Sequence, residues 1–540
     1  MRLKLPIGIQ TFETIRTEGC VYIDKTKYLI NLIEKGHIYF LARPRRFGKS
    51  LAVSTFNAIF SGRKDLFKGL YAEEFLNRPD FKTSPVISLN MSRITTNQGI
   101  DMMELSLRRL TVEIASRFNI EIPEHISSGD ILSSLIINTA KKYNQKVVIL
   151  LDEYDNPYTD FVNEPEMAEK VRNLLRNYYV QIKANDEFIR FTFITGISKF
   201  AKLGVFSTLN TPLDISLMPE YADICGLTET EIIQNFPDYL DDTAKTMNIT
   251  TDELITKMRN YYNGFSFDLY AQSRLYNPYS TLTFFAKKSF TNHWMDTGRS
   301  KVISDYLKNR YLTVEQFRNY PISVDFAANP GDVDTAPPEG FLYQGGYLTL
   351  RQGTTDALSL DYPNTEVLNS MSTLLAQNIL KDQDDDFTFC RMGLLNGLMS
   401  SDCEKVIAVL NRLLASIPYD DFSKAAQQSV YYNEFEIKPQ EWLYRSTILA
   451  FLRGCGVLVF PEIHSNLGRS DLMLSHKGKT WVIELKVAYA GESPAQKAEE
   501  ALRQIIDKNY ATQYPDAVCM GLAIDDAQRQ ITEIRTMNKE

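Results

Sequence analysis

The sequence predicts a multidomain α/β protein: a parallel sheet covered on both faces at the N-terminal end, a helical and mixed middle, and a smaller α/β domain at the C-terminal end. The length of 540 residues exceeds what one hydrophobic core supports. The hydrophobic share of 44% and the charged share of 23% are typical of globular chains. Continuous apolar runs separated by helical patterns indicate parallel strands. We expect domains over residues 1–220, 221–380 and 381–540.

Four apolar runs within the first 200 residues predict buried strands. They are GHIYFLARP, PVISLNMS, QKVVILLDEYD and EFIRFTFITGISKF. Their content of Val, Ile, Leu and Phe is too high for strands with one solvent face. The segments KSLAVSTFNAIFSG and DMMELSLRRLTVEIASRF lie between these runs and predict helices. The alternation therefore predicts one parallel sheet with helices on both faces.

The chain after residue 220 predicts a different organisation. From about 220 to 300 the pattern is helical, and Thr228 with Glu231 forms the pattern of a capping box at the start of one helix. FLYQGGYLTL predicts a hairpin interrupted by glycine, and YPNTEVLNSM predicts a turn into a helix. From about 425 the chain returns to mixed structure: helix EWLYRSTILAFLRG, strands VLVFPEI, DLMLS and TWVIELKV, and helix KAEEALRQIIDKNY.

Charge and cysteine usage exclude several classes of protein. The net charge of −8 argues against a chain that coats nucleic acid or binds a membrane surface. Residues 1–70 nevertheless carry 13 Lys and Arg against 5 Asp and Glu, so a basic segment opens an otherwise acidic chain. No apolar run of 18 residues is present, and the six cysteines are scattered without a CxxC pair. We expect a soluble cytoplasmic protein with no membrane partner, reduced thiols and no zinc site.

The run from Arg43 to Ser50 lies between the first predicted strand and the first predicted helix, where a phosphate-binding loop occurs. Such a loop needs backbone N–H groups at a helix N-terminus, a lysine that reaches the phosphates and a hydroxyl for Mg²⁺. Arg43 stands where GxxxxGK[ST] has its first glycine, so the motif alone is degenerate and a basic turn is the alternative. The expected ATP-binding residues are Arg45, Arg46, Gly48, Lys49 and Ser50, with Ser50 also a Mg²⁺ ligand.

Two carboxylates follow the third predicted strand. Asp152 is expected to bind the nucleotide's Mg²⁺, and Glu153 is expected to act as the catalytic residue that orients the attacking water. By themselves they could be a solvated strand end, but together with the loop they predict ATP binding and, less directly, ATP hydrolysis. Thr195 or Ser198, at the end of the next strand, is expected to sense the γ-phosphate, and a simple strand-terminal turn is the alternative.

Six motifs together resemble the AAA-ATPase-like family of bacterial proteins, which is related to archaeal and signal-transduction P-loop ATPases. They are DKT from Asp24 to Thr26, RPRRFGKSL, LLDEYD, TGISKF, YYNGFSF and YNPYS, and they span about residues 5–300. Arginine at the first loop position agrees with the family's RPRRFGKS although it departs from the wider P-loop class. The resemblance implies a P-loop ATPase core followed by a helical lid, and it leaves open which arginine serves as a finger.

The segment GRSDLMLSHKGKTWVIELKV predicts two strands joined by a turn at residues 477–479. Because side chains alternate across a strand, Glu484 and Lys486 share one face, opposite to Trp481, Ile483, Leu485 and Val487. Charges on an apolar strand are costly unless they have partners, which makes them candidates for a site. Asp471 can approach them across the hairpin. Phosphodiester hydrolysis needs carboxylates that hold Mg²⁺ and a nearby cation, so Asp471 and Glu484 are expected metal ligands and Lys486 the catalytic cation.

This D-x12-ExK arrangement resembles the PD-(D/E)XK nuclease superfamily and implies a restriction-endonuclease-like fold. ExK alone is a common pattern, and an exposed salt-bridged strand is its alternative. The resemblance assigns Glu441 to the acidic position on the first core helix, a further metal ligand, and Gln504 to a catalytic position on the last helix. Glu441 could equally be a first-turn acid favoured by the helix dipole. Glu462 is either a further site acid or a strand-end charge.

These observations lead to two hypotheses about function. The first is an ATP-regulated, Mg²⁺-dependent nuclease that cleaves nucleic acid, with DNA favoured over RNA. The second is a nucleotide-gated switch whose C-terminal domain binds nucleic acid or a protein without cleaving it. The last 100 residues hold 12 basic and 13 acidic side chains, so affinity for nucleic acid is not evident from net charge. Both hypotheses require ATP and Mg²⁺, and both are compatible with a homo-oligomer.

Overall fold

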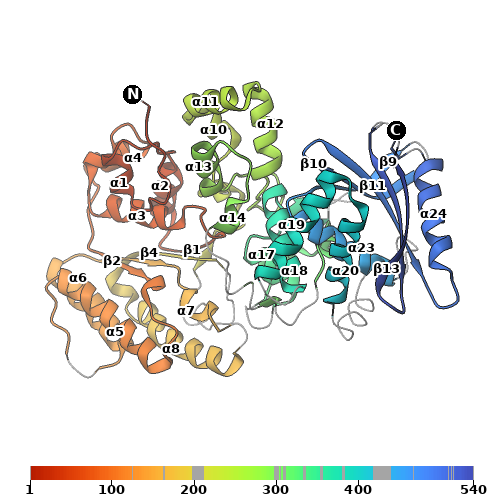
Figure 1. Ribbon diagram of the computed structural model, residues 1–540. Coiled ribbons are helices and arrows are strands. Elements are labelled where there is room, and N and C mark those ends of the chain that lie inside the picture. Colours follow the sequence, from red (N-terminus) through yellow and green to blue (C-terminus); the bar gives the residue numbers. More distant parts are fainter. Residues whose placement is uncertain are drawn as a thin grey trace. The chain divides into compact units, whose positions relative to one another are not determined.

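The computed structural model describes residues 2–123, 126–161, 164–197, 212–296, 303, 306–307, 312–331, 336–352, 357–379, 384–417, 439–465, 468–508, 510–511, 514 and 516–538. The side chains of residues 295–296, 379, 384–386, 439, 461–465, 468–471 and 538 lie outside this description. The chain divides into two compact units, Met1–Val302 with Asn319–Glu366, and Ile303–Arg318 with Val367–Glu540. Each unit has its own five-stranded sheet (Figure 1). The bounds of the three predicted domains stay a prediction.

The first unit is built on a parallel sheet in the order β2-β3-β4-β1-β5. Its strands are β1 (Ile38–Ala42), β2 (Val86–Asn90), β3 (Val147–Asp152), β4 (Ile189–Gly196) and β5 (Leu213–Asp214). The predicted α/β class with a parallel sheet is confirmed, and the four predicted strands are β1 to β4. Because β4 lies between β1 and β3, the carboxyl ends of these three strands are neighbours, at the edge where open α/β sheets bind ligands.

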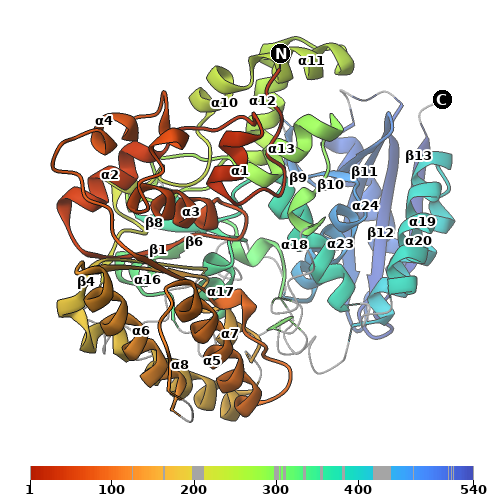
Figure 2. The same ribbon diagram turned by 90° about the vertical axis from the view of Figure 1, so that its left-hand side faces the viewer.

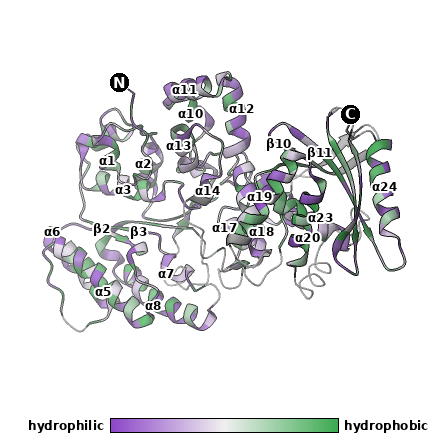
Figure 3. Cartoon of the chain, in the orientation of Figure 1, coloured by the Kyte–Doolittle hydropathy of each residue, from purple (hydrophilic) through white to green (hydrophobic). Residues whose placement is uncertain are grey.

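Helices cover both faces of this sheet, as Figures 1 and 2 show. One side carries α1 (Phe12–Thr17), α2 (Thr26–Lys35), α3 (Lys49–Phe60) and α4 (Ala72–Leu76). The other side carries α5 (Ile100–Arg117), α6 (Ser128–Tyr143) and α8 (Pro165–Ala184). Hydrophilic and hydrophobic residues mix along α5, α6 and α8, as expected of helices that bury one stripe (Figure 3). Every residue of β3 is buried, in agreement with cover from both sides.

A helical region follows the sheet, as predicted. It contains α10 (Glu229–Asn235), α11 (Pro237–Met247), α12 (Thr251–Tyr262) and α13 (Pro278–Lys287). The predicted capping box is present: the Thr228 hydroxyl accepts a hydrogen bond from the Glu231 N–H at 3.1 Å, and the Glu231 carboxylate accepts one from the Thr228 N–H at 2.8 Å. Val21 is buried in the same hydrophobic cluster as Phe236 and Tyr276, so the N-terminal segment is packed against these helices.

The predicted hairpin over FLYQGGYLTL is wrong. Residues 338–344 form the helix α17 (Pro338–Gln344), and only the last two residues of the segment belong to a strand, β7 (Thr349–Gln352). Pro338 occupies a first-turn helix position, where its missing N–H costs nothing, and Gly346 follows the helix with a φ of 80°. β7 instead pairs with β8 (Leu358–Asp361), which also pairs with β6 (Tyr320–Ile322). The predicted helix that follows is confirmed as α18 (Thr365–Ile379).

The second unit has a mixed sheet in the order β13-β12-β11-β10-β9. Its strands are β9 (Leu458–Ser465), β10 (Gly468–His476), β11 (Lys479–Ala488), β12 (Val518–Asp525) and β13 (Gln530–Asn538). Only β11 and β12 are parallel, and α24 (Pro494–Asp507) connects them across one face (Figure 1). The other face carries α19 (Asp384–Ser400), α20 (Cys403–Ala415) and α23 (Pro439–Gly454). The predicted strands and helices of this end are confirmed.

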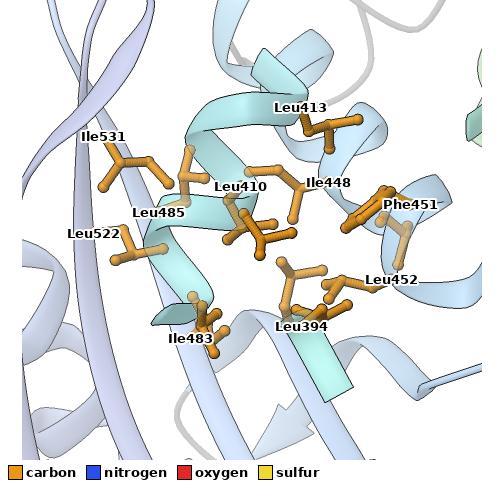
Figure 4. Packing of buried hydrophobic residues seen from close by; sticks show 14 of the residues in the cluster. Leu394, Leu410, Leu413, Ile448, Phe451, Leu452, Ile483, Leu485, Leu522 and Ile531 are labelled. Atoms are coloured by element: carbon orange, nitrogen blue, oxygen red, sulfur yellow. The ribbon is translucent and has the colours of Figure 1, made fainter. Parts of the chain in front are cut away.

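The core of the second unit lies between its sheet and the helices α19, α20 and α23. Figure 4 shows Leu394, Leu410 and Phe451 of these helices facing Ile483, Leu485 and Leu522 of the sheet. Trp481 and Val487 belong to the same cluster. The predicted alternation along β11 is therefore confirmed. Among the helices within the described ranges, none combines the length and the hydropathy needed to cross a bilayer.

Candidate functional site

The loop between β1 and α3 forms the first candidate site. Arg46 and Gly48 adopt φ values of 66° and 99°, and Gly48 directly precedes the first residue of α3, Lys49. A φ of 99° is accessible without strain only to glycine, which explains the residue at position 48. The Lys49 Nζ donates hydrogen bonds to the carbonyl oxygens of Arg43 at 2.8 Å and Pro44 at 3.0 Å. Burial lowers the pKa of Lys49, and nearby carboxylates, Glu153 first among them, oppose this shift.

Arg43 has a structural position that the motif did not reveal. Its side chain is 1% exposed, and its guanidinium lies 4.2 Å from the centre of the Phe267 ring. Its Nη1 donates to the carbonyl oxygens of Ala42 at 2.9 Å and Ser216 at 2.8 Å, and its Nη2 donates to that of Tyr221 at 3.0 Å. Burial lowers its pKa to about 10, so it stays charged at neutral pH. Arg43 therefore links the loop between β1 and α3 to residues 216–222.

The ends of β3 and β4 bring the predicted carboxylates and hydroxyl together. The Thr195 Oγ1 donates to the Asp152 Oδ1 at 2.6 Å, and both residues are buried. Glu153, the next residue, has a φ of 52°, which is uncommon for a residue with a side chain. Burial raises the pKa of Glu153, and Lys49 opposes this shift. Ser198, the alternative to Thr195, lies outside the described residues.

A cavity of about 330 Å³ lies beside the loop. Six of the predicted residues line it: Arg45, Arg46, Gly48, Lys49, Ser50 and Glu153. Asp152 and Thr195 are not among its lining residues and lie deeper at the sheet edge. The volume and the mixture of cations, a hydroxyl and a carboxylate suit a nucleoside triphosphate with Mg²⁺.

Sequence reasoning missed several polar residues of this cavity, among them Asp155 and Tyr279. Asp155 also lines it, is 1% exposed, and accepts a hydrogen bond from the Ile197 N–H at 2.9 Å. Tyr279, from the YNPYS motif, lies beneath the Arg46 guanidinium with 4.8 Å to the ring centre. The last residue of DEYD and the second tyrosine of YNPYS were the available signals, but no rule of spacing predicts which residues lie next to them.

A second cavity of about 100 Å³ adjoins the first and shares Gly48, Leu51 and Leu282 with it. Its other walls are mostly apolar, including Val21, Leu29, Leu227 and Phe236. Together, the two cavities offer a charged compartment and an apolar compartment separated by the loop and the start of α3. This division matches the two chemistries of a nucleotide, a phosphate chain and a flat base.

The DKT motif contributes to the wall of the apolar cavity. The Asp24 carboxylate accepts hydrogen bonds from the Thr26 N–H at 2.8 Å and from the Tyr71 N–H at 2.7 Å. Lys25 lines the cavity, and its Nζ contacts the Glu231 carboxylate at 2.6 Å. Glu231 also caps α10, so this ion pair connects the N-terminal segment to the helical region.

The C-terminal candidate site is centred on β11. Glu484 is 1% exposed, although it lies on an otherwise apolar strand. Its Oε1 lies 3.6 Å from the Lys486 Nζ, and the Lys486 side chain is 28% exposed. The predicted pairing of Glu484 and Lys486 on one face is thus confirmed by their contact. A buried carboxylate beside a half-buried ammonium is a costly arrangement for a purely structural strand.

The strand register gives the position of Asp471, and an effect on the pKa of Tyr489 gives that of Glu441. In the β10–β11 pairing, Leu472 is opposite Ile483, so the register continued by one residue sets Asp471 opposite Glu484. The side chain of Asp471 lies outside the described residues. Glu441, in the first turn of α23, is half-buried and lies close enough to Tyr489 to raise its pKa, second to burial. Among side chains that the structure describes, no three acidic, His or Cys groups gather as a metal site.

Helix α24 lies against the same face of the sheet as Glu484. Gly521 pairs with Glu484 in the parallel register, and a Cβ at Gly521 would lie 2.5 Å from the backbone N of Leu502. The glycine therefore lets the helix approach the sheet. Glu499 faces β13, where its carboxylate lies 3.7 Å from the Arg535 Nε. Gln504, five residues later and half-buried, is therefore on the opposite flank of the helix, toward β11.

Comparisons with known proteins find a family match at each end of the chain. Residues 6–206 match the family described as predicted AAA-ATPase, and residues 439–534 match the PD-(D/E)XK nuclease superfamily. A protein of Azotobacter chroococcum mcd 1, described as an uncharacterized protein in the vnfD 5′ region, is 31% identical over 519 residues. That match covers 95% of this chain and 94% of the Azotobacter protein.

Two solved structures are similar at low identity. Cdc6p from Pyrobaculum aerophilum is 14% identical, with 66% of this chain and 92% of that chain covered and a TM-score of 0.25. The Aeropyrum pernix ORC2 protein, solved as ADPNP–ADP complexes, is 13% identical, with 65% and 93% covered and a TM-score of 0.24. TM-scores this low do not establish a common arrangement of whole chains. The family match and the Azotobacter relative do establish kinship: the chain belongs to the AAA-ATPase-like family and carries a C-terminal domain of the PD-(D/E)XK nuclease superfamily.

Proposed function

We propose that this protein binds and hydrolyses ATP with Mg²⁺ in its first unit, and that nucleotide state regulates a Mg²⁺-dependent nuclease in its second unit. The buried Glu484 in contact with Lys486, opposite the backbone position of Asp471, carries the nuclease part of the proposal. The cavity that gathers six predicted residues around Lys49 supports the ATPase part.

In the first unit, the chain's own residues provide binding and proton control. Lys49 already donates to loop carbonyls, so it exchanges these partners for phosphate oxygens when a nucleotide enters. Ser50 and Asp152 would hold Mg²⁺, which screens phosphate charge. Thr195 orients Asp152 through their 2.6 Å hydrogen bond. Glu153 accepts a hydrogen bond from the attacking water, and its raised pKa makes it a stronger base once ionised.

In the second unit, the residues divide into metal-holding and substrate-orienting groups. Glu484 and Asp471 would hold Mg²⁺, with Glu441 as a further ligand, and the metal would supply an activated water. Lys486, half-exposed beside Glu484, donates to the scissile phosphate or to the attacking water. Gln504, on the β11 flank of α24, orients the same groups. The proposed substrate is nucleic acid, with DNA favoured over RNA; the Lys486 ammonium beside Glu484 suits a polyanion of either kind.

The nuclease part is tested with purified full-length protein on plasmid, linear duplex and single-stranded DNA and RNA with Mg²⁺. Glu484→Gln and Lys486→Ala are each expected to lower the rate of cleavage at least 100-fold, because the first removes a metal ligand and the second removes a cation that stabilises developing charge. Glu499→Gln, on the far flank of α24, is the matched control. Cleavage that survives both site variants would show that the assignment is wrong.

The regulatory part is tested by adding ATP, ADP or no nucleotide to the same assay. Glu153→Gln is expected to bind ATP without hydrolysing it. After ATP is added, the rate of nucleic-acid cleavage by this variant should therefore stay at the value for the ATP-bound protein. Equal cleavage rates in all nucleotide states would refute regulation. A protein that changes its affinity for nucleic acid with ATP yet cleaves nothing would instead support the nucleotide-gated switch.

A further inference from the structure

Helix α24 leaves part of its sheet face uncovered. It packs on β11, β12 and β13. Its Ile505 forms a buried cluster with Met473 of β10, Val482 of β11 and Cys519 of β12. In the β9–β10 pairing, Phe460 lies opposite Met473. Met473 is 3% exposed, but Phe460 is 40% exposed. Helix α24 and its neighbours therefore bury the side chains of this sheet face as far as β10 and leave Phe460 of β9 exposed.

Leu458 and Phe460 together form an exposed apolar strip on β9. Leu458 lies opposite Ser475, two residues from the Phe460 position, and is 52% exposed. The alternate residues Val457 and Val459 are 3% and 8% exposed and belong to the core on the other face. β9 thus presents a buried aliphatic side to the core and an exposed phenyl and isobutyl group on the face of α24.

This strip leads directly to the proposed metal site. The pairs Ser470–Ile463 and Leu472–Pro461 enclose one further pair, Asp471 and Glu462. Together with Glu484 opposite Asp471, three acidic positions form one row across β9, β10 and β11. Phe460 is two residues before Glu462, so its backbone lies about 7 Å from that row.

The charges beyond the strip favour a polyanionic occupant. The turn between β10 and β11 is formed by Lys477 and Gly478, with φ values of 46° and 83°, and Lys477 and Lys479 are both exposed. Ser475, opposite Leu458, is next to this turn. Lys486 lies at the other end of the strip, beside Glu484. Cations at both ends with apolar side chains between them fit a phosphate backbone whose bases meet the apolar groups.

We propose that Leu458 and Phe460 form a stacking surface for unpaired bases of single-stranded nucleic acid that enters the nuclease site. The proposal rests on the proposed nuclease function and adds a substrate class to it. Bases in a duplex already stack on one another, so an exposed phenyl group selects strands whose bases are free. The sugar–phosphate backbone of the bound strand passes over the row of acidic positions, where the metal would hold the scissile phosphate.

The test measures binding separately from cleavage. In a Glu484→Gln background, fluorescence anisotropy gives Kd for a labelled single-stranded DNA, the same RNA sequence and the matching DNA duplex. Phe460→Ala is expected to weaken single-strand binding by about 5- to 150-fold, the range for one stacked base, with duplex binding unchanged. Phe460→Trp retains the binding. Phe389→Ala is the control, because Phe389 is 65% exposed on α19, which covers the other face.

Each outcome decides the proposal. Unchanged single-strand binding in Phe460→Ala, an equal loss for duplex, or no single-strand binding by the parent overturns it. A change in molecular mass without a change in binding shows that β9, an edge strand, pairs with a second copy instead. If Phe460→Ala binds weakly but no form of the protein cleaves, the stacking surface stands and the nuclease function fails. If cleavage occurs and Phe460→Ala binds normally, only the surface fails.

Discussion

Replacing Arg43 by glycine should destabilise the first unit, although it restores the glycine of GxxxxGK[ST]. The guanidinium makes three hydrogen bonds of 3.0 Å or shorter, to Ala42, Ser216 and Tyr221. Hydrogen bonds to a charged group contribute about 1.5–3 kcal/mol each, or roughly 5–9 kcal/mol for three. Removing the ion also recovers its desolvation cost. A fall in pKa from 12.5 to about 10 corresponds to about 3 kcal/mol. The expected net loss is roughly 2–6 kcal/mol.

Calorimetry of the full-length protein measures this loss. We expect the transition of the first unit to fall by several degrees, at roughly 2 °C per kcal/mol for a unit of this size, with the second unit unchanged. Hydrogen exchange of the amides at residues 216–222 should accelerate in the same variant, because the Ser216 and Tyr221 carbonyl groups lose their hydrogen bonds to Arg43 and the segment is held less tightly. Arg45→Gly is the matched control for glycine's backbone entropy. Arg45 is exposed and lines the phosphate cavity, so its loss should weaken ATP binding and leave stability nearly unchanged.

An Arg43→Gly protein with wild-type melting and exchange would refute this reasoning. It would show that the carbonyl groups find other partners, or that the buried charge costs as much as its hydrogen bonds contribute. A variant that melts normally but fails to bind ATP would instead place Arg43 in the phosphate site.

Three further predictions concern the two sites. Lys49→Met should reduce ATP affinity at least tenfold in a titration, because the ammonium that lines the cavity beside the loop is lost. Since burial raises the pKa of Glu153 above 4.5, kcat for ATP hydrolysis should fall on acidification with a midpoint above pH 4.5. A midpoint at or below that value would contradict the role of Glu153 as base. The raised pKa also means that stability contributed by protonated Glu153 is present below pH 4.5 and is lost as pH rises through the folded-state pKa. Gly521→Ala should lower the melting temperature of the second unit and slow nuclease cleavage. Its Cβ would meet the Leu502 N at 2.5 Å and the Ala498 O at 2.6 Å, which displaces α24, and unchanged melting would argue against this contact.

The sequence predicted most local structure because local rules govern it. The buried strands of the first unit, the capping box at Thr228 and the alternation along β11 each depend on neighbouring residues. The loop from Arg43 to Ser50 was predictable for the same reason. The hairpin prediction failed where local rules conflicted. The glycines near residue 345 mark a helix end, and burial of Phe341 and Leu342 favours the helix before it.

Tertiary structure alone decided which distant groups meet. The order β2-β3-β4-β1-β5 sets Thr195 beside Asp152, although 42 residues separate them in the chain. Arg43 is buried against carbonyl groups more than 170 positions away, so its role could not be derived from a motif of eight residues. The uncovered strip at Leu458 and Phe460 exists because α24 ends its cover at β10. Spacing within a sequence reports residue types and local periods, whereas proximity across strands depends on long-range pairing that only the folded chain determines.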